Sequence, residues 1–314
     1  MRGRRSIVAL MILVAGLWTA RRSQAESRTA PPSVTVVAST AVEAHRAAIE
    51  GIRDALAKSS VEVRVADLSA SRSERSAADR FTAPGTRVII AVGTEALQLV
   101  AAERPEVPVI STMVLRNKAG GESSTLSLAA TIVLDVPVPV LLARLKQVFP
   151  GKTRLGIIRN PNSGGPTAAA LEERAQQLGV TVRVVDCPGA EQLLAALLTL
   201  KGHVDFVWCL PDGALYNSAT IKPLILASIE NRLPIIGFSE SFARAGAAVG
   251  VYPDFRDIGL QTGEAAQQII SGQIVHLSEG PRKLKLAVNP SVLRLIGLRY
   301  AAPKTDTEDF SVLQ

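Results

Sequence analysis

Short runs of Val and Ile alternate with longer amphipathic segments rich in Ala, Leu and Glu along most of this chain, and the series occurs twice. A continuous apolar run of four to eight residues is typical of a strand buried on both faces, and a helical segment between two such runs provides the crossover to a parallel neighbour. The alternation therefore predicts an α/β fold with two doubly wound lobes, each a parallel sheet covered by helices on both faces.

The expected elements fall into two series of similar construction. The first contains strands Val34–Ala38, Val61–Ala66, Val88–Val92 and Pro108–Ser111, with helices near Val42–Ala57, Arg72–Asp79 and Glu95–Ala102. The second contains strands Arg154–Arg159, Thr181–Cys187, Asp205–Leu210, Pro234–Phe238 and Ala247–Tyr252, with helices Thr167–Leu178, Ala190–Leu200 and Ile221–Asn231. A chain of 314 residues is long enough to bury two such cores.

Further elements follow the second series, namely a helix at Asp257–Ile270 and a strand at Lys283–Val288. Because the chain still supplies elements after the second sheet is complete, we expect it to cross back, which gives a hinge of several strands and a cleft between the lobes. We assign 34–132 plus 253–275 to an N-terminal lobe, 133–252 plus 276–300 to a C-terminal lobe, and 301–314 to a flexible tail.

Residues 1–25 have the pattern of an export signal. Three arginines precede the apolar run Ile7–Ala20, and small residues, Ser23 and Ala25, occupy the positions that a signal peptidase recognises. The pattern predicts a cleavable signal and a folded part outside the cytoplasm, in the periplasm or an equivalent compartment. An uncleaved N-terminal membrane anchor is the alternative, because Arg21 and Arg22 separate the apolar run from the cleavage site.

The charge of the chain is concentrated in this leader. Residues 1–25 carry five arginines and no acid, so the formal net charge of +7 for the whole chain falls by five to +2 without them. A charge this small is no electrostatic footprint for nucleic acid. We therefore expect no nucleic-acid partner, and we expect the protein to be a monomer.

Catalytic motifs are incomplete. Gly237-Phe238-Ser239-Glu240-Ser241 resembles the nucleophile elbow of a hydrolase, but the second glycine is absent. A triad would also need a suitably placed histidine, and the chain has His45, His203 and His276. No G-x-G-x-x-G sequence follows the first strand of either series, which argues against a dinucleotide. We expect no enzyme activity and no cofactor, and interpret the histidines as surface or packing residues.

Two cysteines, Cys187 and Cys209, invite a disulfide in an exported protein. If the second lobe has the strand order 2-1-3-4-5, they end the strands on either side of Arg154–Arg159, which puts them roughly 9–10 Å apart at the usual strand spacing. That separation exceeds what a disulfide spans. Without a nearby histidine the pair does not form a metal site either, so we expect two free thiols and no metal.

Ligands of doubly wound sheets bind beyond the carboxyl ends of the strands. The loops that follow the expected strands are rich in hydroxyl and amide groups, which suits a small polar solute. The candidate ligand-binding residues in or beside these loops are Thr40, Thr94, Asn160, Asp212, Tyr216, Asn217, Phe238, Ser239 and Tyr252. The aromatic rings among them are placed to stack on a planar ligand.

Asp212 is the most informative of these candidates, because it follows the central strand of its lobe in the sequence Pro-Asp-Gly. Three roles are open for it. It could cap the helix near Ile221, form a turn with Gly213, or bind a cationic group of a ligand through a charge-assisted hydrogen bond.

Four segments carry a resemblance to a known family: LGIIRNPNSGG, VDFVWCLPDGALYNSATI, LPIIGFSESFARAGAAVGVYPDFRDIGLQTGEAAQQIISGQ and LKLAVNPSVLRLIGL. The chain resembles the substrate-binding proteins of ABC transporters with the type I periplasmic-binding fold, in the branch that includes tryptophan- and tyrosine-binding members. The resemblance covers most of residues 34–300. Pro-Asp-Gly replaces the commoner Pro-Thr-Asp-Asn, which leaves the amino-acid assignment open.

The resemblance implies a receptor that closes on a small solute between its lobes and delivers it to a membrane permease. It also implies that Asp212 pairs with a ligand ammonium group. The expected function is therefore an extracytoplasmic solute-binding component of an ABC transporter. A sensory receptor subunit for a membrane kinase or chemoreceptor is the alternative, and an exported enzyme that uses the cleft is a weaker one.

Overall fold

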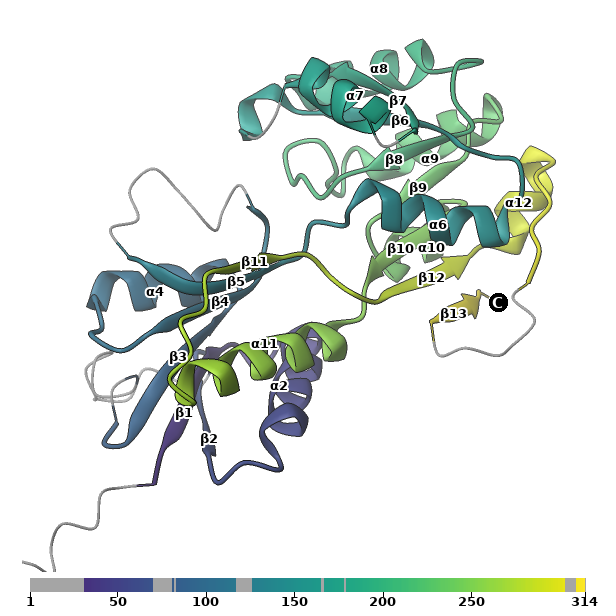
Figure 1. Ribbon diagram of the computed structural model, residues 1–314. Helices are drawn as coiled ribbons and strands as arrows, with labels where there is room; N and C mark the ends of the chain where they lie inside the picture. The colour runs from purple at the N-terminus through teal and green to yellow at the C-terminus, as the bar shows by residue number, and fades with distance from the viewer. Residues whose placement is uncertain are drawn as a thin grey trace, which may run out of the picture.

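The computed structural model describes residues 31–69, 81, 83–116, 126–164, 167–177, 179–302 and 309–313. The expected export signal and the expected helix at Arg72–Asp79 lie outside these residues. The described chain forms two α/β lobes (Figure 1), as the repeated series of strands and helices predicts. None of the described helices is long and apolar enough to cross a membrane.

The N-terminal lobe is built on a parallel sheet of six strands in the order β11-β5-β4-β3-β1-β2. The strands are β1 (Ser33–Ala38), β2 (Glu62–Asp67), β3 (Thr86–Val92), β4 (Val109–Val114), β5 (Leu128–Val133) and β11 (Leu277–Glu279). Helices α2 (Glu43–Leu56) and α11 (Phe255–Ile270) pack on one face, and α4 (Thr94–Glu103) packs on the other.

The C-terminal lobe has a sheet of seven strands in the order β13-β12-β10-β9-β8-β6-β7, in which the β10–β12 pair alone is antiparallel. The strands are β6 (Arg154–Arg159), β7 (Thr181–Asp186), β8 (Phe206–Cys209), β9 (Ile235–Gly237), β10 (Val249–Pro253), β12 (Leu284–Val288) and β13 (Phe310–Val312). The run β7-β6-β8-β9-β10 confirms the predicted order 2-1-3-4-5. Cys187 and Cys209 are both free and buried.

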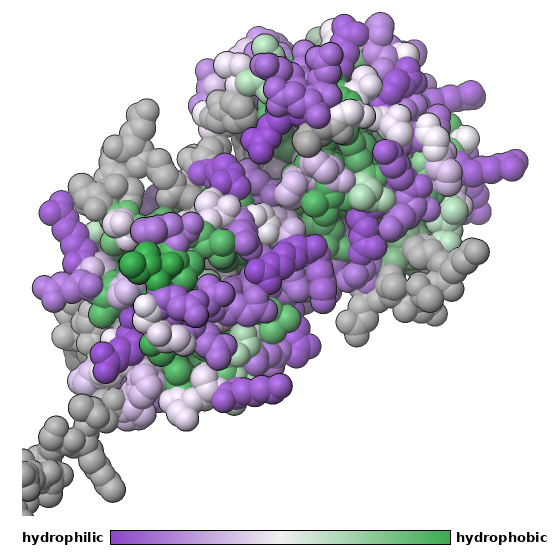
Figure 2. Space-filling view, viewed as in Figure 1, coloured by the Kyte–Doolittle hydropathy of each residue, from purple (hydrophilic) through white to green (hydrophobic). Residues whose placement is uncertain are grey.

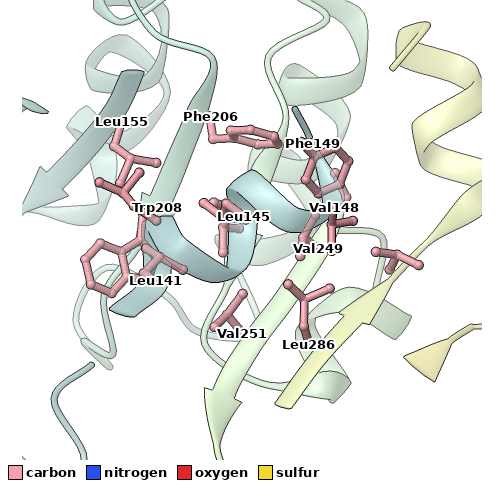
Figure 3. Packing of buried hydrophobic residues seen from close by; sticks show 14 of the residues in the cluster. Leu141, Leu145, Val148, Phe149, Leu155, Phe206, Trp208, Val249, Val251 and Leu286 are labelled. Carbon is pink, nitrogen blue, oxygen red and sulfur yellow. The ribbon is translucent and has the colours of Figure 1, made fainter. Parts of the chain in front are cut away.

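Helices cover both faces of this second sheet. One face is covered by α6 (Val138–Val148) and α12 (Pro290–Ile296). The other face is covered by α8 (Leu193–Thr199), α9 (Ile221–Glu230) and α10 (Glu240–Arg244). Helix α7 (Ala168–Gln177) follows β6 in the chain. Figure 3 shows the core between α6 and the sheet, where Leu141 and Leu145 pack near Trp208 and Phe206. The rings of Phe149 and Phe206 meet edge to face with centroids 5.1 Å apart.

The chain passes between the lobes three times: from β5 to α6, from β10 to α11, and from β11 to β12. A Cβ added to Gly280 would lie 2.9 Å from the Asp135 carbonyl oxygen, so the first and third crossovers run side by side. The space-filling view shows the lobes as two masses that meet at this junction (Figure 2). A hinge of several segments, as expected, joins the lobes.

Two boundaries differ from the sequence-based assignment. Leu277–Glu279 pair with β5, so the N-terminal lobe extends past 275. Phe310–Val312 pair with β12, so this part of the expected flexible tail is a strand. Leu313 is buried against Ala243 and Ala287, and the Arg144–Asp309 ion pair at 2.9 Å fastens the strand beside α6. Both strands have three residues, too few to show a periodic pattern.

Helices α2 and α11 of the N-terminal lobe pack closely against each other. A Cβ built on Gly259 would lie 2.0 Å from the Ala48 carbonyl oxygen, and one on Gly51 would lie 2.0 Å from the Arg256 carbonyl oxygen. Only glycine lets two helix backbones approach this closely. Since α11 directly follows the second crossover, this contact anchors that crossover to the N-terminal lobe.

Asp205, which immediately precedes β8, ties the start of that strand to the start of β6. Its carboxylate, 8% exposed, accepts hydrogen bonds from the backbone N–H groups of Thr153 (3.1 Å) and Arg154 (3.0 Å) and from the Arg154 guanidinium (3.0 Å). Burial alone would raise the pKa of Asp205, but these hydrogen bonds outweigh burial and lower the pKa to about 2.

We expect Asp205→Asn to lower the free energy of unfolding at pH 7 by about 1–2 kcal/mol. The folded pKa lies below the ordinary value of 3.8, so the carboxylate stabilises the fold above that value. This stabilisation is lost as the pH falls toward 2. Urea denaturation of both proteins at pH 7 and pH 3 measures the difference, which should shrink at the lower pH. An equal difference at both pH values would contradict this account.

Candidate ligand-binding site between the lobes

Each lobe has a topological switch point, the place where a doubly wound sheet binds its ligand. In the N-terminal lobe α2 leads from β1 to β2, whereas α4 leads from β3 the other way to β4, so the switch point lies between β1 and β3. In the C-terminal lobe it lies between β6 and β8. The chain leaves the carboxyl ends of β5 and β10 directly into crossovers, so both carboxyl edges point toward the junction of the lobes (Figure 1).

Asp212 joins the two loops at the C-terminal switch point. Its Oδ2 accepts a 2.5 Å hydrogen bond from the hydroxyl of Ser163, which lies in the loop after β6. Its Oδ1 accepts from the backbone N–H groups of Ala214 (2.8 Å) and Leu215 (3.2 Å). Three hydrogen bonds leave a carboxylate with one further acceptor position, and Asp212 is half-buried.

The structure decides between the two structural roles that the sequence left open for Asp212. The carboxylate forms the turn after β8 and does not cap α9, which is preceded by Thr220. The third role, binding a cationic ligand group, is compatible with the turn because an acceptor position remains.

Asn160, Asn217 and Ser239 also stand at the carboxyl edge of the C-terminal sheet, and each caps a local turn or helix. Asn160, 7% exposed, accepts from the Asn162 N–H at 2.9 Å. The Asn217 side chain accepts from the Ala219 N–H at 3.0 Å, and Ser239 accepts from the Phe242 N–H at 3.1 Å as the N-cap of α10. Their side chains shape the loops around Asp212.

The aromatic candidates differ in burial: one lies in the hydrophobic core, and two remain partly exposed at the edge of the sheet. Tyr216 is 5% exposed, with its ring 6.1 Å from that of Phe238 and 6.2 Å from that of Phe242, so it is a core residue. Phe238 is only half-buried. Tyr252, also half-buried, donates its hydroxyl to Glu240 at 3.0 Å, and burial raises the pKa of this phenol. Phe238 and Tyr252 are thus the rings that remain partly accessible.

We expect Tyr216→Phe to leave the free energy of unfolding unchanged or to raise it by up to about 1 kcal/mol. The Tyr216 hydroxyl is buried and makes no hydrogen bond of good geometry within the described chain. Its polar neighbour is the Cys209 thiol, a weak hydrogen-bonding group, and burial raises the pKa of Tyr216 well above the ordinary range. Removing an unpaired buried polar group removes a desolvation cost. Chemical denaturation checks this, and a loss of more than 1 kcal/mol would show that the hydroxyl is paired, with the neighbouring Cys209 thiol as its nearest candidate.

In the N-terminal lobe, Thr40 connects the carboxyl ends of β1 and β2. Its backbone N–H donates to Asp67 Oδ1 at 3.0 Å, and its hydroxyl donates to Asp67 Oδ2. The Thr40 hydroxyl is the main reason that the pKa of Asp67 is depressed. Thr94 begins α4 directly after Gly93, whose φ of +86° favours glycine. Thr94 therefore lies at the switch point, and Thr40 lies on its β2 side.

A histidine stands at this switch point that sequence reasoning assigned to the surface or to packing. His45 is in the first turn of α2, and its Nδ1 lies 3.2 Å from the Ser39 carbonyl oxygen, at the end of β1. Its Cε1 and Nε2 both lie 3.1 Å from the position of a Cβ on Gly93, at the end of β3. The ring therefore spans the two strands, which could be inferred only once β1 and β3 were known to be neighbours.

A cavity of about 600 Å³ lies away from both switch points. It is lined by residues 104–108, 126–129 and 273–276, together with Ile269. These segments precede β4, β5 and β11, so the cavity is at the amino edge of the N-terminal sheet, opposite the junction. Because the cavity lies at the opposite edge of the sheet, its volume is no reason to include it in the candidate ligand site.

Residues 33–301 match the family model described as ABC transporter substrate binding protein. The match covers more than half of the chain and both lobes. The chain belongs to this family. The resemblance drawn from the four sequence segments is thereby confirmed, and the family is one of extracytoplasmic solute-binding proteins, not of enzymes.

Similar proteins agree with this membership. A Tyrosine-binding protein of Clostridioides difficile (strain R20291) is 22% identical over 207 residues, which cover 64% of this ABC substrate-binding protein and 59% of that relative. The match thus spans less than two thirds of the relative's own length.

Two solved structures have the same fold. The ligand-free, open structure of a substrate binding protein with adhesive properties from Clostridium difficile matches with a TM-score of 0.61 and 18% identity over 90% of this chain and 99% of that one. An ABC domain in complex with L-Trp from Streptococcus pneumonia matches with a TM-score of 0.53 and 16% identity over 90% and 100% of the two chains. At these identities the likeness establishes the fold of this substrate-binding protein and nothing about its ligand.

Proposed function

We propose that this protein is the extracytoplasmic solute-binding component of an ABC transporter, and that it binds a small polar solute, an aromatic or other amino acid, between its lobes and delivers it to a membrane permease. The observation that carries the proposal is the half-buried carboxylate of Asp212, which joins both loops of a switch point and keeps an acceptor position. A carboxylate in this position favours a ligand that carries an ammonium group.

The proposed mechanism is hinge closure. Three crossovers join the lobes, and each lobe directs a set of polar loops toward the junction. A ligand that contacts both lobes binds the closed arrangement more tightly than the open one, so ligand binding shifts the population toward closure. The permease would then recognise the closed, loaded form.

Aromatic amino acids are the first ligands to test. One relative is named a tyrosine-binding protein, and one structure of the same fold is a complex with L-Trp. Phe238 and Tyr252 offer partly accessible rings at the carboxyl edge of the C-terminal sheet, where an aromatic side chain could stack.

A thermal-shift screen tests the proposal. The purified protein would be heated with amino acids, sugars, nucleosides or small organic acids, each well above its expected Kd. A ligand that binds only the folded form raises Tm by mass action. We expect an aromatic or another amino acid to raise Tm by several degrees. A sugar or nucleoside as the only active compound would overturn the proposed ligand class, and no active compound would overturn the binding function.

A further inference from the structure

His45 holds its imidazole in one tautomer at the N-terminal switch point. Its Nδ1 lies 3.2 Å from the carbonyl oxygen of Ser39. A carbonyl oxygen can only accept, so Nδ1 must carry the proton. In the neutral ring the other nitrogen, Nε2, is then a hydrogen-bond acceptor.

Within the described chain the acceptor nitrogen of His45, Nε2, is not hydrogen-bonded. Nε2 lies over Gly93, where a Cβ would come within 3.1 Å of it, and no hydrogen bond joins it to another residue of the described chain. The ring is half-buried. Gly93 suits this position because its φ is positive and because a Cβ would crowd the imidazole.

The surroundings keep the ring neutral. Burial lowers the pKa of His45 below its ordinary 6.5, and the Ser39 carbonyl and the charge of Glu95 at the start of α4 oppose this only in part. Within the part of the chain that the structure describes, Arg46 and Asp67 are further charged groups on this side of the lobe, and both hydrogen-bond to Thr40. At neutral pH the N-terminal lobe thus presents an acceptor, and not a cation, at its switch point.

We propose that His45 Nε2 is the acceptor by which the N-terminal lobe selects ligands that carry an N–H or O–H donor on their side chain. The inference rests on the proposed function and names the ligand class more closely. With the ligand ammonium at Asp212 in one lobe, the side chain points to the other, where a phenol O–H or an indole N–H meets Nε2. A benzyl side chain would cover Nε2 without pairing it, which costs affinity because the buried acceptor loses its water.

The test compares L-tyrosine with L-phenylalanine by calorimetric titration at pH 7.5. We expect the wild type to prefer L-tyrosine by about tenfold or more. His45→Asn keeps a side-chain amide that can donate to Ser39 but loses the acceptor at the Nε2 position, and the preference should fall to about threefold or less. His45→Gln, which can present an oxygen near that position, should retain more of the preference than His45→Asn.

The pH dependence of ligand affinity is a second measurement, and a histidine with a purely structural role would not produce the pattern expected here. As the pH falls through the pKa of His45, which lies below 6.5, Nε2 becomes protonated and can no longer accept. Wild-type affinity for L-tryptophan, whose indole N–H can only donate, should therefore fall with the pH over this range, while affinity for L-phenylalanine and the affinities of His45→Asn should change much less.

The outcomes are distinguishable. If His45→Asn keeps the wild-type preference for L-tyrosine, or if the wild type shows none, the inference about His45 is overturned while the proposed binding function stands. If the wild type binds neither amino acid, the proposed aromatic ligand and the inference about His45 both fall. His45→Gln guards against misfolding, because a variant that folds and keeps the preference shows that the site tolerates substitution.

Discussion

Replacing Gly259 with valine is expected to lower the free energy of unfolding by about 3 kcal/mol. A Cβ at this position would lie 2.0 Å from the Ala48 carbonyl oxygen, and the neighbouring close approach at Gly51 prevents α2 from simply sliding along α11. The two helices would have to separate, which opens the core around Ile52 and Ile258. Cores packed to native density do not absorb such a displacement cheaply.

The measurement is urea denaturation followed by circular dichroism, with Gln268→Val as the matched control. Gln268 is exposed on the same helix, so valine there adds the same β-branched side chain without a clash and should cost less than about 0.5 kcal/mol. If Gly259→Val were as stable as Gln268→Val, the α2–α11 contact would not anchor the crossover as described.

The second large effect concerns the ligand. Asp212→Asn should weaken binding of the ligand by about 100-fold, because a charge-assisted hydrogen bond to an ammonium group is replaced by a neutral contact. Its folding stability should change by less than about 1 kcal/mol. The amide oxygen can still accept from the N–H groups of Ala214 and Leu215, and the amide nitrogen can donate to the Ser163 hydroxyl, reversing the existing bond.

Two companion variants sharpen this result. Asp212→Ala should lose both affinity and about 1 kcal/mol of stability, since the turn loses its acceptor. Asp186→Asn removes a half-exposed carboxylate at the end of β7, which is separated from β8 by β6, and should bind as the wild type does. If Asp212→Asn also bound ligand like the wild type, Asp212 would be a turn residue without a ligand role.

The sheets could be predicted from the sequence because each central strand is a continuous apolar run. The order β7-β6-β8-β9-β10 follows from the crossover rule once those runs are recognised. Strands β11 and β13 could not be found this way, because three residues carry no periodicity and their pairing depends on partners far along the chain.

The sequence indicates at which edge of the sheets the candidate site lies, but it does not show how the residues of the site contact one another. The carboxyl ends of the strands follow from the fold class, and Asp212 could be placed there. Its bond to Ser163 joins residues 49 positions apart, which no local pattern indicates. Tyr216 was a candidate because it follows a strand, but the turn formed by Asp212 brings it into the core beside Phe242. His45 has no motif around it, and its position depends on strands β1 and β3 being neighbours.

The most direct test of the account is the distance between the lobes with and without ligand. Cysteines introduced at Gln98 on α4 and Ala195 on α8, both exposed, can carry spin labels, because the native thiols are buried. A pair at Gln98 and Gln268 within the N-terminal lobe is the control. On adding saturating L-tyrosine or L-tryptophan, the account predicts a shorter interlobe distance and an unchanged control distance. A ligand that binds tightly while the interlobe distance stays the same would contradict closure of the two lobes around it.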